Sequence, residues 1–332
     1  MNRFRALLTA SFGRHYLAQA IHDKGSRSEK LILVDAPGKK HIGAVGDILE
    51  LENTSDDQAR MISIAQRKNL LYRSDAFKSK SIAANVDQIL VVLATMPAFA
   101  PDLLGRAVIA AEISQIELRI ILNKCDLKEN IDFARQQLIP YRSLGYSVHE
   151  VSAKFNPQSI AELHPFLQGK VSVLVGQSGM GKSTLLNAWV PNADAITQEY
   201  SIKLDSGKHT TTACRYFDLP EWGRSENGKL GALIDSPGFQ EFGLAHLSVS
   251  ELQHAFKEFK HYLGKCRFHN CTHDSEPECA IQNAVQENKI SRDRLALFKQ
   301  LVSDSKTADT QILGITPAKE RWSTSTTKPS KR

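Results

Sequence analysis

The segment 171-VSVLVGQSGMGKSTLLNAWV-190 decides the fold. Its first five residues are mostly apolar and predict a buried strand, whereas residues 182–190 have the spacing of a helix. Between them, residues 176–183 fit the pattern G-x-x-x-x-G-K-[ST]. Between a strand and a helix, such a loop presents successive backbone N–H groups and a positive helix end to phosphate oxygens. The segment therefore predicts a phosphate-binding loop in an α/β domain.

The residues of this loop have distinct expected roles. The Lys182 ammonium is expected to neutralise the β- and γ-phosphates of a nucleotide, which makes Lys182 a candidate catalytic residue. The Ser183 hydroxyl is expected to ligate Mg²⁺. The predicted nucleotide contacts comprise the whole loop: Gly176, Gln177, Ser178, Gly179, Met180, Gly181, Lys182, Ser183 and Thr184.

A motif for recognising the base lies upstream of the loop. Asn123, Lys124, Cys125 and Asp126 directly follow the apolar run 118-LRIIL-122. The Asp126 carboxylate can accept hydrogen bonds from N1–H and the exocyclic amine of guanine, which adenine does not offer; such a site discriminates by about 10⁴. Asn123 is expected to brace the loop, and Lys124 to cover the base. A second short motif, at the end of the next predicted strand, brings its backbone toward the guanine carbonyl: Ser152, Ala153 and Lys154.

Two further segments suit the γ-phosphate end of a nucleotide. The motif 235-DSPG-238 follows the strand-like run 230–234, so that Asp235 suits a water-mediated contact with Mg²⁺ and Gly238 offers its N–H to the γ-phosphate. The segment 207-GKHTTT-212 has the composition of a switch loop, and one of its threonines, for which we choose Thr211, completes the Mg²⁺ shell. Together with the N-K-x-D motif, these segments predict that the nucleotide is GTP.

The order of these motifs is unusual. Ordinary small GTPases run from the phosphate loop through the switch threonine and D-x-x-G to N-K-x-D and S-A-K, whereas here N-K-x-D and S-A-K come first. The termini of a doubly wound sheet lie close together at the surface, so cutting the chain elsewhere preserves the site. We therefore predict a circularly permuted GTPase domain whose last switch loop leads into the C-terminal region.

The residue that positions the hydrolytic water is less obvious. A glutamine directly after Gly238 would orient this water in a Ras-like enzyme, but Phe239 occupies the position and Gln240 lies one residue further. Our candidate is His209, beside the switch threonines, because a neutral imidazole can hold a water and accept a proton. The alternative is that His209 is a solvent-facing loop residue, and His246 is a weaker candidate. Without the glutamine, we expect slow basal turnover and activation by a partner.

Composition restricts the class of protein. The chain has 332 residues, 42% of them hydrophobic, and a formal net charge of +6, which is enough for two or three domains with cores of their own. No apolar run approaches the roughly 18 residues that span a bilayer, and the N-terminus lacks the pattern of a signal peptide. We therefore expect a cytoplasmic protein without a membrane partner. The basic excess permits a nucleic-acid partner without demonstrating one.

The region before the α/β domain has a different pattern. Residues 5–73 read as short alternating strands separated by Gly, Pro, Asn and Asp turns, which predicts a small β-barrel. An OB-like barrel is the first choice and an SH3-like barrel the alternative. From 86-VDQILVVLAT-95 onward, buried strands alternate with helical segments, as in a parallel sheet with helices on both faces.

Three of the five cysteines lie close together near the C-terminus. Cys266, Cys271, His273 and Cys279 supply three thiolates and an imidazole within one short loop. A closed set of four such ligands suits a structural Zn²⁺ site, and a reducing compartment makes a metal site more plausible than disulfides. His269 is the competing imidazole ligand.

The sum of these motifs resembles the circularly permuted, ribosome small-subunit-dependent GTPase A family (RsgA, also called YjeQ). The resemblance extends over nearly the whole chain and includes 45-VGD-47, 67-RKNLLYR-73, 84-ANVD-87, 207-GKHTTT-212, 235-DSPG-238 and the Cys-Cys-His-Cys loop. It implies an N-terminal OB barrel, a permuted GTPase domain and a C-terminal helical zinc domain. It also implies GTP hydrolysis stimulated by the 30S ribosomal subunit and its 16S rRNA, release linked to hydrolysis, and a role in late subunit maturation.

The expected domain limits are 1–75 for the barrel, 76–245 for the GTPase domain and 246–304 for the zinc domain, followed by a basic, disordered tail at 305–332. We expect a monomer with one structural Zn²⁺, and Mg²⁺ bound with GTP. The main alternative is a zinc-containing RNA-binding GTPase of another RNA-processing pathway.

Overall fold

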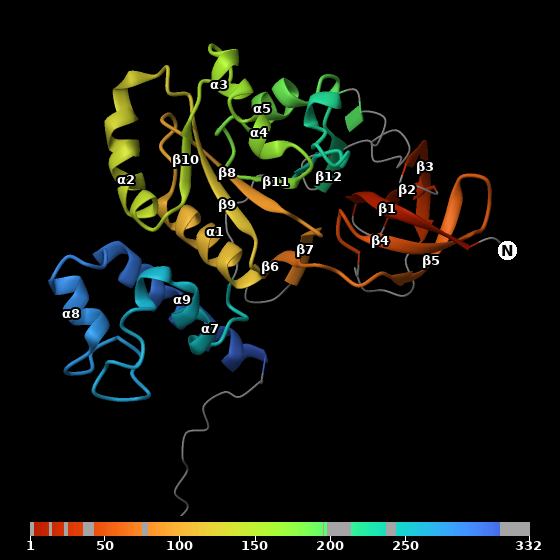
Figure 1. The fold of residues 1–332 in the computed structure, drawn as a ribbon. Coiled ribbons are helices and arrows are strands. Elements are labelled where there is room, and N and C mark those ends of the chain that lie inside the picture. Colours follow the sequence, from red (N-terminus) through yellow and green to blue (C-terminus); the bar gives the residue numbers. More distant parts are fainter. Residues whose placement is uncertain are drawn as a thin grey trace, which may run out of the picture.

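A computed structural model describes residues 3–12, 15–22, 26–35, 43–74, 79–194, 196–197, 214–236 and 244–312. A β-barrel lies at one end of the molecule, an α/β sheet in the middle and a group of helices at the other end (Figure 1). This arrangement agrees with the predicted barrel, GTPase fold and helical module. Within the described part of the chain, each helix is too short or too polar to cross a bilayer.

The N-terminal barrel has five strands. These are β1 (Arg3–Phe12), β2 (His15–Ile21), β3 (Arg27–Asp35), β4 (Ile48–Asn53) and β5 (Gln58–Ile64). They pair in the order β1-β2-β3-β5-β4, and a further β4–β1 pairing closes the barrel. The β3–β5 pair is parallel. This order and the parallel pair are those of an OB barrel and exclude the SH3-like alternative.

The central sheet is parallel apart from one strand. Its strands are β8 (Gln88–Ala94), β9 (Glu117–Asn123), β10 (Ser147–Glu150), β11 (Val171–Val175), β12 (Cys214–Asp218) and β13 (Ala232–Asp235). They lie in the order β10-β9-β8-β11-β13-β12, with β12 antiparallel to β13. All seven residues of β8 are buried, as the continuous apolar run predicts for a strand covered on both faces.

Helices cover both faces of this sheet. They are α1 (Pro101–Ser114), η2 (Lys128–Asn130), α2 (Ile131–Ser143), α3 (Pro157–Ala161), α4 (His164–Leu167), α5 (Lys182–Trp189) and η3 (Glu221–Gly223). In Figure 1, α1 lies on the side of the sheet that faces the C-terminal helices, whereas α3, α4 and α5 lie on the opposite side. Because β8, β9, β10, β11 and β13 are parallel, their carboxyl ends lie at one edge of the sheet, and the predicted motifs begin there.

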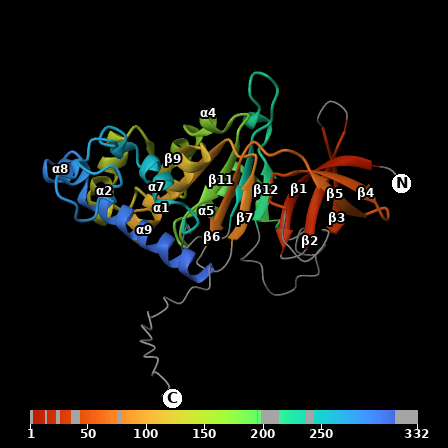
Figure 2. The ribbon, with the colours of Figure 1, turned by 90° about the horizontal axis from the view of Figure 1, so that it is seen from below.

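The barrel and the central sheet form one continuous sheet, which the sequence did not predict. Strand β12 pairs with β13 along one edge and with β1 of the barrel along the other, where Ala10 lies opposite Arg215 and Ser11 opposite Cys214. Figure 2 shows β12 beside β1 at this junction. The strand that follows the predicted switch segment therefore joins the two domains directly.

A second junction connects the barrel with the start of the central sheet. Asn85 Nδ2 donates to the Gly46 carbonyl at 2.8 Å, and the Lys68 amide donates to Asn85 Oδ1 at 2.8 Å. On the barrel side, the buried Asp47 carboxylate accepts two hydrogen bonds of 2.7 Å from the Arg67 guanidinium. The short hairpin of β6 (Leu70–Ser74) and β7 (Ser79–Ala84) lies between these residues in the sequence. The motifs quoted at 45–47, 67–73 and 84–87 are thus structural contacts between domains.

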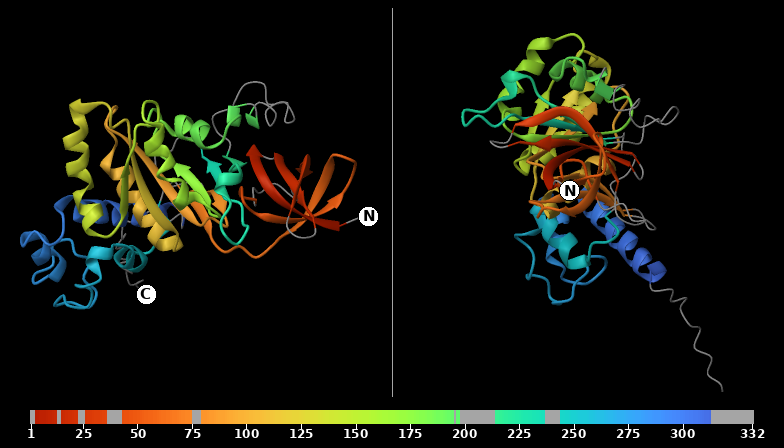
Figure 3. Two further views of the ribbon diagram at one scale, coloured as in Figure 1. Left: turned by 45° about the horizontal axis from the view of Figure 1, so that its top comes forward. Right: turned by 90° about the vertical axis from the view of Figure 1, so that its right-hand side faces the viewer.

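The C-terminal module consists of α7 (Val249–Ala255), η4 (Lys257–Phe259), α8 (Ala280–Gln286) and the long α9 (Arg292–Ile312). Ser248 begins α7 with a capping box to Glu251. The right panel of Figure 3 shows α9 extending from this module below the barrel.

The position at which α9 ends corrects one expectation. The tail was predicted to begin at residue 305, but α9 continues to Ile312. The Ser305 hydroxyl donates to the Leu247 carbonyl at 2.6 Å, and the preceding Asp304 pairs with Arg106 of α1 at 3.0 Å. These contacts stabilise the last turns of α9, whose sequence has little apolar pattern of its own. Residues 313–332 lie outside the described residues.

Candidate functional site

The predicted phosphate loop lies where expected, between β11 and α5. Gly181 has a φ of +93°, and a β-carbon there would lie 2.2 Å from Asn123 Nδ2, so glycine is required on both counts. The Lys182 ammonium, more than half-buried, donates to the carbonyls of Gly176 at 2.7 Å and Gln177 at 2.9 Å. Ser183 and Thr184 are exposed at the helix N-terminus. The lysine therefore lies across its own loop, with hydroxyl groups beside it.

Asn123 joins three of the predicted motifs. Its side chain is 2% exposed; Nδ2 donates to the Met180 carbonyl of the phosphate loop at 3.0 Å, and Oδ1 accepts from the Ala153 amide at 3.0 Å. The N-K-x-D, S-A-K and phosphate-loop segments are therefore held against one another by one buried amide. We expected Asn123 to brace its own loop, and the structure extends this role to two other loops.

The other base-recognition residues lie beside Asn123. The Ser152 hydroxyl makes a short hydrogen bond to the Asp126 carboxylate. Lys124, whose φ of 60° is left-handed, donates from Nζ to the Met96 carbonyl at 2.8 Å, and its own carbonyl accepts from the Thr95 hydroxyl at 2.7 Å. The half-buried Asp126 is therefore held by the Ser152 hydroxyl, and Lys154, the last residue of S-A-K, is exposed.

Cys125 is the variable residue of the N-K-x-D motif. Its half-buried thiol donates to the Leu122 carbonyl at 3.2 Å, and burial raises its pKa to about 11. The group remains a neutral thiol at physiological pH, as expected for a packing residue.

Asp235 ends β13 beside the phosphate loop. Burial raises the pKa of its carboxyl to about 6, against the opposing charges of Lys182 and Arg215. Burial also lowers the pKa of the Lys182 ammonium, which the Asp235 carboxylate partly offsets. The half-buried Asp235 carboxylate and the exposed Ser183 hydroxyl are oxygen donors of the kind that Mg²⁺ prefers, so the residues present fit that ion.

Several predicted residues cannot be placed. His209, Thr211, Gly238, Phe239 and Gln240 lie outside the described residues. His246 is described and lies after the switch segment, where burial lowers the pKa of its imidazole. The assignment of the hydrolytic residue thus stays a prediction.

Sequence reasoning missed two residues at this site. Thr95 directly follows β8 and donates to the Lys124 carbonyl, and Arg215 on β12 lies directly opposite Asp235 with only 6% of its surface exposed. A charged residue inside the otherwise apolar run of β12 was the available signal for Arg215. Thr95 offered no comparable signal, because its partner is 29 residues away in sequence.

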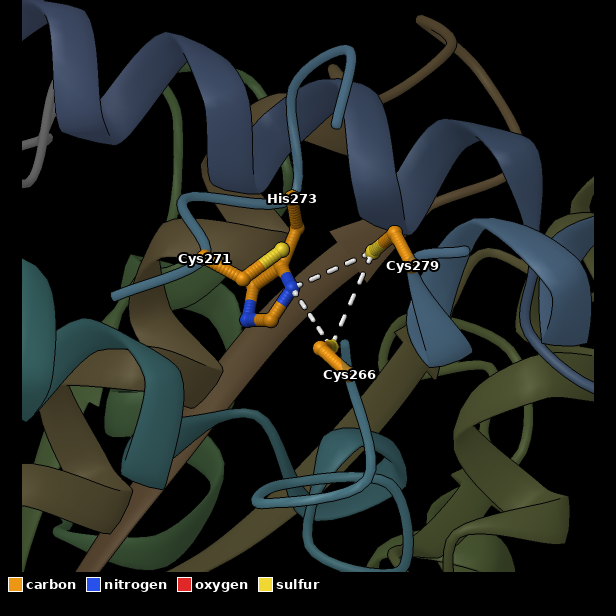
Figure 4. Close-up of side chains that lie close together, drawn as sticks. All are labelled: Cys266, Cys271, His273 and Cys279. Atoms are coloured by element: carbon orange, nitrogen blue, oxygen red, sulfur yellow. Dashed lines mark hydrogen bonds between the residues drawn. The ribbon is translucent and has the colours of Figure 1, made fainter. Parts of the chain in front are cut away.

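The structure brings together the four predicted metal ligands. One ligand atom from each of Cys266, Cys271, His273 and Cys279 lies within 4.8 Å of the others. His273 Nδ1 lies 3.3 Å from Cys279 Sγ and 3.6 Å from Cys266 Sγ, as Figure 4 shows. His269 is exposed and does not belong to the cluster.

The surroundings of the cluster are those of a closed site. His273 is 3% exposed, and its other nitrogen, Nε2, lies 3.1 Å from the side-chain amide of Gln253 on α7. Its ring also packs near Phe259 and Phe298. A Cys₃His donor set with an oriented histidine and apolar packing fits a structural tetrahedral metal ion, with no position left for a substrate.

Comparison with known proteins agrees with this geometry. A family model described as RsgA GTPase matches residues 64–245. A protein from Paraburkholderia phytofirmans, named small ribosomal subunit biogenesis GTPase RsgA, is 50% identical over 304 residues, which cover 91% of this chain and 94% of that protein. The chain belongs to the RsgA GTPase family. It is therefore a GTPase whose nucleotide-binding motifs occur in permuted order.

Other RsgA relatives give the same result. The protein of that name from Burkholderia pseudomallei strain K96243 is 49% identical over 91% of this chain and 93% of its own length. The crystal structure of YjeQ from Thermotoga maritima superposes with a TM-score of 0.65 at 26% identity, covering 92% of this chain and 99% of that one. YloQ, a circularly permuted GTPase, superposes with a TM-score of 0.62 at 25% identity, covering 92% and 96%. The likeness thus includes the barrel and the C-terminal module as well as the GTPase domain.

Proposed function

We propose that this chain is a GTPase that binds the 30S ribosomal subunit, assists its late maturation in the cytoplasm, and hydrolyses GTP to GDP and phosphate with stimulation by the ribosome. The observation that carries the nucleotide part is Asn123, which fastens the phosphate loop to both base-recognition motifs. The relatives named small ribosomal subunit biogenesis GTPases support the ribosomal part.

Each nucleotide-binding residue has a proposed task. Asp126 reads the guanine base while the Ser152 hydroxyl orients its carboxylate. Lys182 exchanges its two backbone acceptors for phosphate oxygens, where its positive charge stabilises the transferring phosphoryl group. Ser183, Thr211 and Asp235 would hold Mg²⁺, directly or through water. When bound, this ion would neutralise charge on the phosphates. The remaining proposed contacts come from the phosphate loop, the two base motifs and Gly238.

For the attacking water we retain His209 as the proposed positioning group, since Phe239 offers no hydrogen-bonding atom at the position of the usual glutamine. A histidine in place of this glutamine is consistent with slow turnover in the absence of a partner. We keep the domain limits 1–75, 76–245 and 246–304 as part of the proposal, and extend the last module by the observed end of α9 at Ile312.

The C-terminal module is proposed to hold one structural Zn²⁺ through Cys266, Cys271, His273 and Cys279. Directly after the ligand Cys266, residues 267–270 are exposed. Among them, the Arg267 guanidinium, which also pairs with the exposed Glu278, lies 5.6 Å from the centre of the Phe268 ring, and Phe268 is 40% exposed. A cation beside an exposed aromatic ring suits the backbone and the unstacked bases of RNA, as does an OB barrel. These features support a 16S rRNA partner.

Co-sedimentation tests the proposed partner. Purified 30S subunits are pelleted through sucrose with the full chain in the presence of a non-hydrolysable GTP analogue, GDP or no nucleotide. The proposal predicts more chain in the pellet with the analogue than with GDP. Equal pelleting in all three conditions, or none, would contradict the proposal and favour a GTPase of another RNA-processing pathway.

A further inference from the structure

A groove outside the nucleotide site has no assigned occupant. It is lined by residues of α1, α2 and α9 and has a volume of about 300 Å³. Figure 1 shows the arrangement of these three helices. Phe99, Leu104, Pro140 and Leu297 form the apolar part of the groove's lining, and polar side chains, among them the acidic Asp293, line the rest. The volume is at the lower end of the range for small-molecule sites, and suits one large side chain with its neighbours.

The polar groups of the groove favour a cationic partner. The Arg294 guanidinium, which also lines the groove, is already neutralised by Glu258, at 2.5 Å from Nε to Oε1. Asp293 is exposed and makes no ion pair within the described part of the chain. The groove therefore offers a partly apolar pocket and a negative charge that no ion pair within the described residues compensates.

The chain itself contains a segment with the complementary chemistry. Residues 313–332 carry five basic residues and one acidic residue, and Trp322 is their one large aromatic side chain. Lys319 and Arg321 lie close to Trp322 in sequence, so a docked indole would bring positive charge to the rim. This segment is attached to α9, which forms one wall of the groove.

The length of the segment allows this contact. Along a helix that rises about 1.5 Å per residue, Ile312 lies roughly 22 Å beyond Leu297. The ten residues from Ile312 to Trp322 span at most about 33–36 Å when extended. Gly314 and Pro317 are residue types that end a helix and turn the chain. Because the segment is tethered, even weak intrinsic affinity suffices for docking, at an effective concentration in the millimolar range.

We propose that the C-terminal segment 313–332 docks back on this groove, with the Trp322 indole between α1, α2 and α9 and a flanking basic residue at Asp293. This role is separate from nucleotide binding and RNA binding. A partner protein or a second copy of the chain is the competing occupant of the groove.

Fluorine NMR of the full chain labelled with 5-fluorotryptophan tests the proposal. The chain has three tryptophans: Trp189 is fully buried, Trp222 stacks on His164 at 3.7 Å, and Trp322 is assigned by Trp322→Phe. Docking predicts that the Trp322 resonance differs from its position in denaturant and lacks the shift between H₂O and D₂O that an exposed indole shows.

Groove variants decide where Trp322 lies. Ala296 is an exposed groove residue on α9, so Ala296→Phe fills the groove without entering the core, and should move the Trp322 resonance to its position in denaturant. Asp293→Lys should shift it in the same direction. Ser303→Phe, on the same helix outside the groove, is the matched control and should leave it unchanged.

The Trp189 and Trp222 resonances report whether each variant is folded, and Gln300→Phe replaces Ala296→Phe if that variant unfolds. A Trp322 resonance that is solvent-exposed in the unmodified chain would overturn the proposal. A solvent-shielded Trp322 resonance whose position is the same in the unmodified chain, in Ala296→Phe and in Gln300→Phe would overturn the proposal as well.

Discussion

At the scale of single residues, one buried amide determines the geometry of the nucleotide site. Asn123 contacts the carbonyl of Met180 and the amide of Ala153, which belong to segments far apart in the sequence. Buried backbone groups that lose their partner cost about 1–3 kcal/mol each. Substituting Asn123 should therefore disturb the nucleotide site, although Asn123 takes no part in the proposed hydrolysis itself.

Asn123→Ala should lower the free energy of unfolding by about 2–4 kcal/mol, because it leaves two backbone groups without their partner. It should also weaken GDP binding at least tenfold, measured with a fluorescent GDP analogue. Asn187→Ala is the control, since Asn187 is exposed on α5 and, in the described part of the chain, its side chain hydrogen-bonds to the Asp194 carboxylate alone. Equal effects of the two variants would contradict the bracing role.

A second prediction at this scale concerns pH. Burial, with Arg119 and Arg142 nearby, lowers the pKa of the His149 imidazole, and its buried Nε2 has no hydrogen-bond partner among the residues that the structure describes. The unfolded chain then binds a proton more readily than the folded chain, so stability is lost as the pH falls through about 6.5. Urea unfolding at pH 7.5 and pH 5.5 should show a smaller loss for His149→Gln than for the unmodified chain.

The matched control for this prediction is His254→Gln, because His254 is exposed on α7. It should retain the full pH dependence of the unmodified chain. If His149→Gln loses as much stability on acidification as the unmodified chain does, the neutral state of His149 is not a source of stability.

At the scale of elements, the Cys/His loop contains two histidines four residues apart, His269 and His273, and only one of them can be the zinc ligand. His273 is buried among three thiols, whereas His269 is exposed. His273→Ala should reduce the zinc content, measured by mass spectrometry after gel filtration, and His269→Ala should leave it at one ion per chain. Loss of zinc from the His269 variant alone would reverse the ligand assignment.

The contact between α9 and the segment after α7 depends on a buried ion pair. The side chains of Arg294 and Glu258 are 5% and 8% exposed. Removing one partner of such a pair leaves a buried charge and costs about 3–5 kcal/mol. Glu258→Gln should therefore lower the free energy of unfolding by about that amount. Glu221→Gln, which breaks the exposed pair with Arg224, should have no measurable effect in the same urea titration.

The elements differ in how well their sequences predicted them. Strand β8 was predictable because both of its faces are buried, so that every residue contributes to the signal. Strand β12 was missed because Arg215 and Asp218 interrupt its apolar pattern, and it is held by pairing with a barrel strand roughly 200 residues earlier in sequence. The end of α9 was misplaced for the same reason, since contacts with Leu247 and Arg106 stabilise it. Contacts distant in sequence are invisible to local periodicity.

At the scale of the whole molecule, the site residues were more predictable than their connections. The phosphate loop, N-K-x-D and the metal ligands have spacings imposed by chemistry, so their motifs identify them directly. The continuous sheet from barrel to GTPase domain, with β12 as the shared strand, follows from tertiary pairing and left no local trace. Because β12 directly follows the predicted switch segment in the sequence, β12 connects the barrel with the segment that is expected to respond to the γ-phosphate.

The central claim is that the chain is a GTPase activated by the small ribosomal subunit. The most direct test is the rate of phosphate release from GTP by the full chain, with and without purified 30S subunits, and with Lys182→Ala as the inactive control. The account predicts a slow basal rate, a rise of at least about tenfold with 30S subunits, and no rise for Lys182→Ala. A fast rate without subunits, or a slow rate that the subunits do not change, would contradict it.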